Sequence, residues 1–143
     1  MNAELTIIIP AKNEAGMLPK LLNSLCKQDY AEMAETRVLV ADAGSTDGTV
    51  EVALSFRGRL QLEVIPGGLP SVGRNAGARL ATTKYVLFLD ADVELPEPTL
   101  LRRAIWRMRR QKLHLATTNI ACRHGGFFDD ALYAGNNLVQ RLG

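Results

Sequence analysis

The chain has 143 residues, of which 47% are hydrophobic and 22% are charged, and its formal net charge is +2. This length supports one domain with a single core, and the composition is ordinary for a globular protein, so disorder is not the default. The net charge is too small to argue for a nucleic-acid partner, and we expect no such partner. No run approaches the roughly 18 apolar residues of a membrane span.

The N-terminal residues and the cysteines indicate where the protein works. No basic segment precedes the first apolar run, so no signal peptide is expected. Cys26 and Cys122 lack the spacing of a metal site or a disulfide framework. The sequence therefore predicts reduced thiols and a cytoplasmic location.

Short apolar runs alternate with helical patterns along the first half of the chain. Residues 5–9 predict a buried, β-branched strand, and residues 17–26 repeat apolar side chains at helical spacing. A second strand is predicted at 37–41, and a helix follows at 50–56 after a turn rich in capping residues. Alternating apolar residues at 60–65 predict a third, more exposed strand.

The second half continues this alternation of strands and helices. The predicted elements are a helix at 71–81, a strand at 85–89, a helix from 96–98 to about 112, a strand at 113–121 and a helix at 129–142. Ser71 and Asp129 are expected to cap their helices, and Pro98 suits a first helical turn. Five apolar residues without alternation at 85–89 predict a buried parallel strand.

This order of elements predicts the fold class. Alternating strands and helices are typical of an α/β protein whose mostly parallel sheet carries helices on both faces. We expect residues 1–143 to form one domain. In such a sheet, the loops after the first, second and fourth strands can converge on one edge, where open α/β proteins bind ligands.

Charged side chains gather in those three loops. Asp90 and Asp92 follow the fourth strand, and two neighbouring carboxylates favour a divalent cation with oxygen ligands between them. Asp42 follows the second strand, where a carboxylate can accept an N–H from a base or the hydroxyls of a ribose. Arg74, after a glycine-rich loop, suits a diphosphate oxygen.

Plainer explanations exist for each feature taken singly. Asp90 and Asp92 also fit a helix cap after a core strand, and Arg74 fits a surface arginine. Gly44 and Gly48 let the backbone approach a ligand, and the helix N-terminus after them favours anions. The same turn also fits an ordinary connection between a strand and a helix.

Four segments together resemble family 2 glycosyltransferases of the GT-A fold. They are Ile-Pro-Ala-Lys-Asn-Glu at 9–14, Asp-Ala-Gly-Ser-Thr-Asp-Gly-Thr at 42–49, Gly-Arg-Asn-Ala-Gly at 73–77 and Phe-Leu-Asp-Ala-Asp at 88–92. They occur in the family's order and rough spacing, and the resemblance covers residues 5–95 well. It implies a Rossmann-like GT-A nucleotide-diphospho-sugar transferase fold.

The resemblance also implies a reaction and a set of site residues. It implies an inverting, metal-assisted transferase with a nucleotide-diphosphate sugar as donor and Mg²⁺ or Mn²⁺ as cofactor. Asp92, with Asp90, would hold the metal through the DXD motif. The residues implied around the donor are Pro10, Ala11, Asn13, Glu14, Asp42, Gly44, Ser45, Arg74, Asn75, Asp90, Ala91 and Asp92.

Family members usually continue into a second half that supplies the acceptor pocket and the general base. By this resemblance the chain is a C-terminally truncated, donor-binding part. The general base is not identified; Asp129 and Asp130 are candidates, with helix capping as the alternative for Asp129. We expect nucleotide-sugar binding with weak or absent transfer, to an acceptor such as a lipid or a polysaccharide.

Two other functions fit parts of the sequence. Residues 86–93 match the strand-Asp-x-Asp pattern of haloacid-dehalogenase-like phosphatases, in which Asp90 would be the nucleophile. Such an enzyme needs a later lysine and an acidic pair, for which only Lys112 and 129–130 are available. The other alternative is a donor-binding domain without transferase activity.

The helix at 101–112 carries the main surface hypothesis. Its cationic face fits a solvated helix packed on the sheet, which is the favoured interpretation; it also fits peripheral contact with an anionic membrane, at the inner face of that membrane, or contact with nucleic-acid phosphates. Trp106 needs no role beyond packing in a core or an interface. A truncated sheet would also expose an edge or an apolar face, which favours a homo-oligomer.

Overall fold

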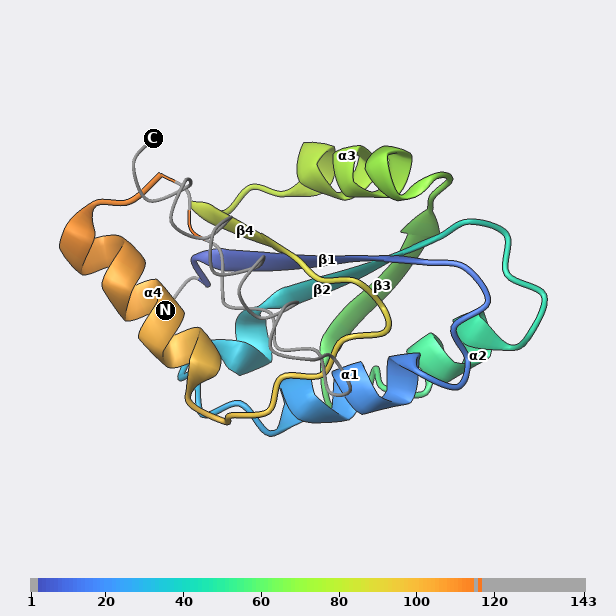
Figure 1. The fold of residues 1–143 in the computed structure, drawn as a ribbon, viewed down its shortest axis with the longest axis horizontal. Coiled ribbons are helices and arrows are strands. Elements are labelled where there is room, and N and C mark those ends of the chain that lie inside the picture. Colours follow the sequence, from blue (N-terminus) through green and yellow to red (C-terminus); the bar gives the residue numbers. More distant parts are fainter. Residues whose placement is uncertain (1–2, 115, 117–143) are drawn as a thin grey trace, which may run out of the picture. The chain divides into compact units, whose positions relative to one another are not determined.

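The computed structural model describes residues 3–114 and residue 116. Its helices and strands alternate along the chain (Figure 1). In order they are β1 (Leu5–Ala11), α1 (Leu18–Cys26), the short 3₁₀ helix η1 (Met33–Glu35), β2 (Arg37–Asp42), α2 (Thr49–Leu54), β3 (Gln61–Pro66), α3 (Pro70–Leu80), β4 (Tyr85–Phe88) and α4 (Leu100–Gln111). The predicted α/β architecture is confirmed.

The four strands form one parallel sheet in the order β3-β2-β1-β4. Ile8 of β1 lies opposite Leu39 of β2 on one side and Phe88 of β4 on the other. The central strands β1 and β2 are buried along most of their length, as expected for strands covered on both faces. Because the strands are parallel, the loops after β1, β2 and β4 leave from the same edge.

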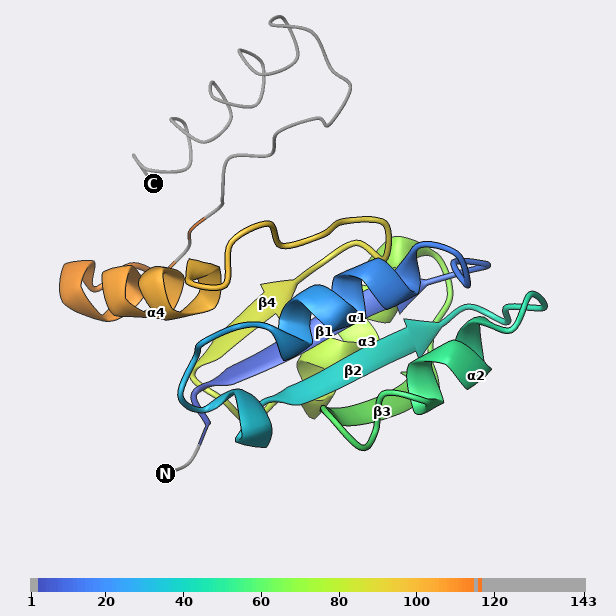
Figure 2. The same cartoon turned by 90° about the horizontal axis from the view of Figure 1, so that it is seen from below.

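Helices cover both faces of this sheet. Figure 1 and Figure 2 show α3 on one face and α1 and α2 on the other. A Cβ added to Gly77 of α3 would lie 2.6 Å from Cγ2 of Ile8, and one added to Gly73 would lie 3.3 Å from Cβ of Pro10. The helix therefore packs on the sheet more closely than side chains at these positions would permit.

The chain divides into two compact units, one up to Arg102 and one from Arg103 onward. Helix α4 begins in the first unit and continues into the second. Within the first unit, Gln28 donates from Nε2 to the carbonyl of Glu97 (2.8 Å) and accepts at Oε1 from the N–H of Leu101 (3.1 Å). In the part of the chain that is described, no helix is both long and apolar enough to cross a bilayer.

Strand β1 runs two residues further than predicted and includes Pro10. A proline lacks the N–H that a central strand normally donates. Here Ile8 faces β4, since its carbonyl accepts the N–H of Leu89, and Ala11 faces β2, since its carbonyl accepts the N–H of Ala43. Pro10 therefore faces the β4 side, beyond the end of β4 at Phe88, where no partner strand requires its N–H.

Strand β4 is less buried than predicted. Val86 is 37% exposed and Phe88 is 45% exposed. Within the described residues β4 is an outer strand, with β1 as its neighbour. An unbroken apolar run is typical of a strand buried on both faces, but the sequence does not tell which strand lies at the edge.

The predicted starts of two helices were also wrong. Helix α3 has Leu69 as N-cap and Pro70 in its first turn, so Ser71 lies inside the helix. Helix α4 begins at Leu100 rather than at Pro98, because hydrogen bonds hold the preceding residues outside it; the carbonyl of Pro98 accepts the N–H of Asp29 (2.9 Å).

Most of the predicted last strand and the whole last helix, with Asp129 and Asp130, lie outside the described residues. Leu113 and His114, from the start of that predicted strand, are not in a strand.

Substitution of Gly77 by alanine tests the close packing of α3. We expect Gly77→Ala to lower the free energy of unfolding by about 1–3 kcal/mol, because the new Cβ overlaps the buried side chain of Ile8. Gly58→Ala is the control, since nothing lies within 4 Å of a Cβ there. Urea unfolding measures both, and equal stability of the two variants would contradict this packing.

Candidate functional site

Hydrogen bonds join the loops that follow β1 and β2. Asn13 donates its backbone N–H to Oγ of Ser45 (2.9 Å) and accepts the N–H of Thr46 at Oδ1 (2.9 Å). The N–H of Ala43 donates to the carbonyl of Ala11 (2.9 Å). Asn13 has φ = 52°, a left-handed conformation that asparagine tolerates better than most residues. The predicted residues of these two loops therefore lie side by side.

The two carboxylate oxygens of Asp42, the last residue of β2, differ in their hydrogen bonding. Oδ2 accepts the N–H groups of Gly44 and Ser45, both at 3.1 Å, and Gly44 has φ = 77°, which glycine adopts without strain. Oδ1 is buried and has no hydrogen-bond partner among the described residues. A buried carboxylate oxygen without a donor is unfavourable, so an N–H or O–H that reached this atom would stabilise it.

Asp47 organises the turn that leads into α2. Its Oδ1 accepts from both the N–H and the hydroxyl of Thr49, and its Oδ2 accepts the N–H of Ala15 (3.1 Å). The hydrogen bond from the Thr49 side chain is the main reason that the pKa of Asp47 is lowered. A carboxylate thus already lies at the start of α2, so the expected anion-binding role of this helix N-terminus is not supported.

Arg74 and Asp90 form an ion pair between α3 and the loop after β4. Their Nη2 and Oδ1 atoms are 2.6 Å apart, and the side chains are 38% and 59% exposed. Gly73 brings this part of α3 against Pro10 and Ala41, at the ends of β1 and β2. Packing of the glycine therefore explains why Arg74 reaches the predicted edge.

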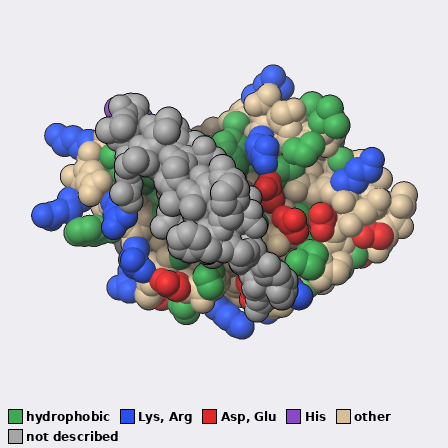
Figure 3. Space-filling view, viewed as in Figure 1, with side chains coloured by type: hydrophobic (Ala, Val, Ile, Leu, Met, Phe, Trp, Pro, Cys, Tyr) green, Lys and Arg blue, Asp and Glu red, His purple; other side chains and the backbone are tan. Residues whose placement is uncertain are grey.

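Glu14 connects the first loop electrostatically with the loop after β4. Partial burial raises the pKa of Glu14, and the negative charges of Asp92 and then Asp47 raise it further. Acidic side chains gather over this part of the molecule in Figure 3, with basic side chains near them. The loops after β1, β2 and β4 therefore share one strongly acidic region.

Two of the predicted residues contribute less to this arrangement. Asn75 is exposed on α3, and in the described part of the chain no hydrogen bond links its side chain to the other predicted residues. Ala91 is buried between the two aspartates of its motif, with 4% of its surface exposed.

The acidic residues fit part of a cation site. Asp92 is exposed, and its carboxylate is the type of ligand that Mg²⁺ and Mn²⁺ prefer. Residues 3–114 and 116 contain no group of three or more His, Cys, Asp or Glu side chains that could hold a metal. The carboxylates therefore fit a cation that takes its remaining oxygen ligands from phosphate and water, as Mg²⁺ usually does.

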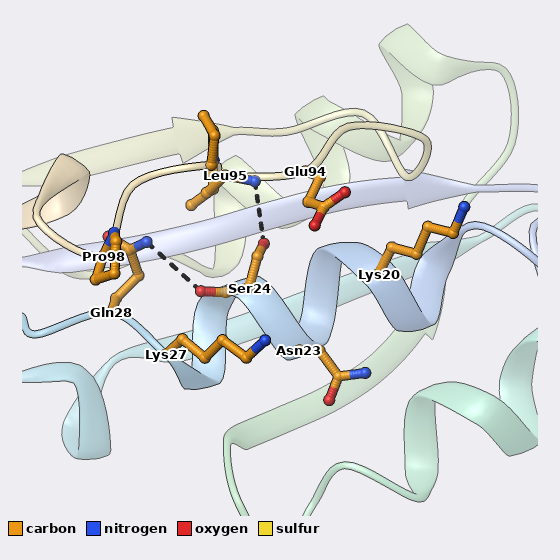
Figure 4. A pocket seen from close by; sticks show the side chains of 9 residues that line it. Lys20, Asn23, Ser24, Lys27, Gln28, Glu94, Leu95 and Pro98 are labelled. Carbon is orange, nitrogen blue, oxygen red and sulfur yellow. Dashed lines mark hydrogen bonds between the residues drawn. The ribbon is translucent and has the colours of Figure 1, made fainter. Parts of the chain in front are cut away.

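A hollow of about 300 Å³ lies between α1 and residues 94–98 (Figure 4). Ser24 accepts the N–H of Leu95 at its Oγ (3.1 Å), and Lys20 and Lys27 line the rim. None of the predicted donor residues lines this hollow. Sequence reasoning missed it because residues 94–98 have no regular secondary structure, and only the fold brings them against α1.

The family called Glycosyl transferase family 2 matches residues 6–136. The chain belongs to this family. The poly(ribitol-phosphate) β-N-acetylglucosaminyltransferase TarS of Staphylococcus aureus is 37% identical over 100 residues, which cover 66% of this chain and 17% of TarS. A PGL/p-HBAD biosynthesis glycosyltransferase of Mycobacterium bovis is 35% identical over 147 residues, covering 95% of this chain and 56% of that protein.

Solved structures agree with this membership. The crystal structure of S. aureus TarS 1–349 in complex with UDP-GlcNAc has a TM-score of 0.77 at 28% identity, over 87% of this chain and 36% of that one. The mannosyltransferase PcManGT of Pyrobaculum calidifontis, in complex with GDP-Man and Mn²⁺, has a TM-score of 0.67 at 28% identity, over 76% and 33%. The chain thus has the GT-A fold and spans less than two thirds of each of these proteins.

The pKa of Asp47 predicts how stability depends on pH. Because the pKa of Asp47 is lowered in the folded state, the unfolded chain binds more protons than the folded chain as the pH falls through the acidic range. Asp47 therefore contributes to stability above the ordinary aspartate pKa. This contribution is lost as the pH falls through the pKa of Asp47 in the folded state. We expect Asp47→Asn to lower the melting temperature at neutral pH.

The difference between wild type and Asp47→Asn should shrink as the pH falls below the ordinary aspartate range. Glu35→Gln, which removes an exposed carboxylate outside this turn, is the control. Thermal unfolding followed by circular dichroism at several pH values measures the effect, and a difference that grows on acidification would contradict the assignment.

Proposed function

We propose that this chain binds a nucleotide-diphosphate sugar at the shared edge of β1, β2 and β4 and acts in sugar transfer. The observation that carries the proposal is Oδ1 of Asp42, a buried acceptor without a donor in the described part of the chain. The N–H of a nucleobase or the hydroxyl of a ribose would satisfy it. Ala11 and Asn13 lie beside Asp42 and would border the same ligand.

Arg74 is proposed to bind the diphosphate. Its ion pair with Asp90 is partly exposed, and such pairs contribute only about 0–1 kcal/mol. The guanidinium can therefore turn from Asp90 to a phosphate oxygen at little energetic cost. Planar guanidinium groups suit phosphate oxygens because several N–H groups donate at once.

Asp92, together with Asp90, is proposed to hold Mg²⁺ or Mn²⁺. The cation would supply positive charge that neutralises the leaving diphosphate. Asp92 and Glu14 repel each other in the structure, so this region favours a cation. The Mn²⁺ in the complex of PcManGT with GDP-Man supports the proposal from a member of the same fold.

The proposed reaction is direct displacement of the nucleotide by an acceptor hydroxyl at the anomeric carbon, with inversion. The hydroxyl loses its proton to a general base, which we assign to none of the described residues. Donor binding without transfer is the second candidate function. A phosphatase reaction is not proposed, since the family match is to glycosyl transferases and Asp90 is paired with Arg74.

Substitution of Asp42 tests the binding of the nucleoside. We expect Asp42→Asn to weaken the binding of UDP-GlcNAc or GDP-mannose, whichever raises the melting temperature of the wild type more, by roughly tenfold to a hundredfold. An amide keeps one acceptor for the N–H groups of Gly44 and Ser45 but removes the charge and one acceptor oxygen. Isothermal titration calorimetry measures the affinity.

Glu63→Gln is the control for Asp42→Asn, because Glu63 lies in the middle of β3 and pairs with Arg37. Its donor affinity should equal that of the wild type. Unchanged affinity in Asp42→Asn, with both variants folded, would contradict the proposal.

Substitution of Asp92 tests the proposed cation. With wild type, Mn²⁺ should raise the donor affinity, and Asp92→Asn should remove that gain, a loss of roughly tenfold to a hundredfold. Glu94→Gln removes a carboxylate two residues away and should keep the gain. Calorimetry with and without Mn²⁺ distinguishes the two, and a donor affinity that is independent of Mn²⁺ in the wild type would refute this assignment.

A further inference from the structure

Helix α4 lies in a part of the chain with an unusual distribution of charge. Residues 98–128 contain seven of the 17 lysines and arginines, whereas all 15 aspartates and glutamates lie elsewhere. Five of the seven cations are arginines of α4. Basic side chains gather over this helix in Figure 3. Although the net charge of the whole chain is low, positive charge is therefore concentrated on α4.

The arginines of α4 surround the only tryptophan of the chain, Trp106. On a helix, the nearest neighbours of a side chain lie three and four residues away in each direction. For Trp106 all four of these positions are arginines: Arg102, Arg103, Arg109 and Arg110. A fifth, Arg107, follows it directly in the sequence. We call these six residues the Trp106 face.

The Trp106 face is exposed, and the opposite side of the helix is not. Trp106 is 57% exposed, and each of its five arginines is exposed. Leu101 and Ile105, on the other side of α4, are 2% and 5% exposed. Of the two expectations for Trp106, packing in a core was therefore wrong, because the apolar stripe that buries this helix runs along its other side; packing in an interface stays a prediction.

The exposed indole of Trp106 lies beside arginine side chains, an arrangement that suits the boundary between lipid and water. The guanidinium carbon of Arg110 lies 5.3 Å from the ring centroid of Trp106, within cation–π distance. An indole combines a large apolar surface with one N–H donor, and such side chains concentrate at the boundary between lipid and water. Arginines beside it would meet the phosphate groups at that same boundary.

We propose that the Trp106 face binds the surface of a membrane rich in anionic phospholipids. The arginines contact lipid phosphates, Arg102 being also paired with Asp29 (3.2 Å), and the indole of Trp106 enters the headgroup region. A nucleic acid offers the same phosphate charge, but proteins that bind single strands stack successive bases on several aromatic side chains. The Trp106 face has one aromatic ring and otherwise only arginines, which favours lipid. This proposal does not depend on the binding of a sugar nucleotide.

The emission of Trp106 gives a direct test, since no other tryptophan contributes. The full chain is mixed with phosphatidylcholine vesicles that contain about 30% phosphatidylglycerol, or with phosphatidylcholine alone. We expect co-sedimentation and a blue shift of the emission only with the anionic vesicles. Both effects should disappear at about 1 M salt, where charges are screened beyond about 3 Å.

Two double variants with the same change in net charge locate the binding surface. Arg107→Gln with Arg110→Gln should weaken binding to anionic vesicles roughly thirtyfold, because each cation near an anionic leaflet contributes a factor of about five. Arg57→Gln with Arg79→Gln removes two exposed cations elsewhere and should bind like the wild type. Melting curves by circular dichroism establish that both variants are folded.

Trp106→Ala separates insertion of the indole from charge attraction. It should weaken co-sedimentation with anionic vesicles while leaving the dependence on salt unchanged, since the arginines remain. Equal binding to both vesicle types, or equal losses in the two double variants, would overturn the proposal. Binding of the wild type to a single-stranded oligonucleotide but not to anionic vesicles would assign the Trp106 face to nucleic acid instead.

Discussion

Parallel pairing of β1 with β2 on one side and β4 on the other is the constraint on which the site depends. Because the three strands run in the same direction, their polar ends leave the sheet at one edge. Asp42 ends β2 opposite Ala11 of β1, and Asp90 follows shortly after Phe88 of β4. The strands thus bring together side chains that are nearly 50 residues apart in the sequence. No single loop could assemble this set.

Close packing of α3 on the sheet adds a basic side chain to the site. Gly77 lies against Ile8, and Gly73 lies against Pro10 and Ala41, where a Cβ would meet neighbouring atoms. Arg74 therefore starts from backbone that lies almost on the ends of the central strands. The same glycines that make the helix weak in isolation make this approach possible.

The sequence was most informative where a pattern repeats over many residues. Periodic apolar residues predicted the four described strands and the helices between them, and the order of these elements predicted the parallel sheet. Predictions from the sequence were wrong or missing where contacts between distant segments determine the structure. The edge position of β4, the displaced start of α4 and the hollow beside Ser24 all depend on which segments meet. The partner of Arg74 and the unpaired oxygen of Asp42 are likewise properties of the fold.

The charge of the site is the physical reason for proposing a cation and an arginine together. Partial burial, and then repulsion by Asp92 and Asp47, raise the pKa of Glu14, whereas hydrogen bonds to Asp47 stabilise its charged form. A diphosphate carries more negative charge into this region, so repulsion would oppose its binding. Arg74 alone cannot offset that repulsion while Asp90 neutralises it. A divalent cation at Asp90 and Asp92 would attract the phosphates and also release Arg74 from Asp90, so that both positive groups act on the same ligand.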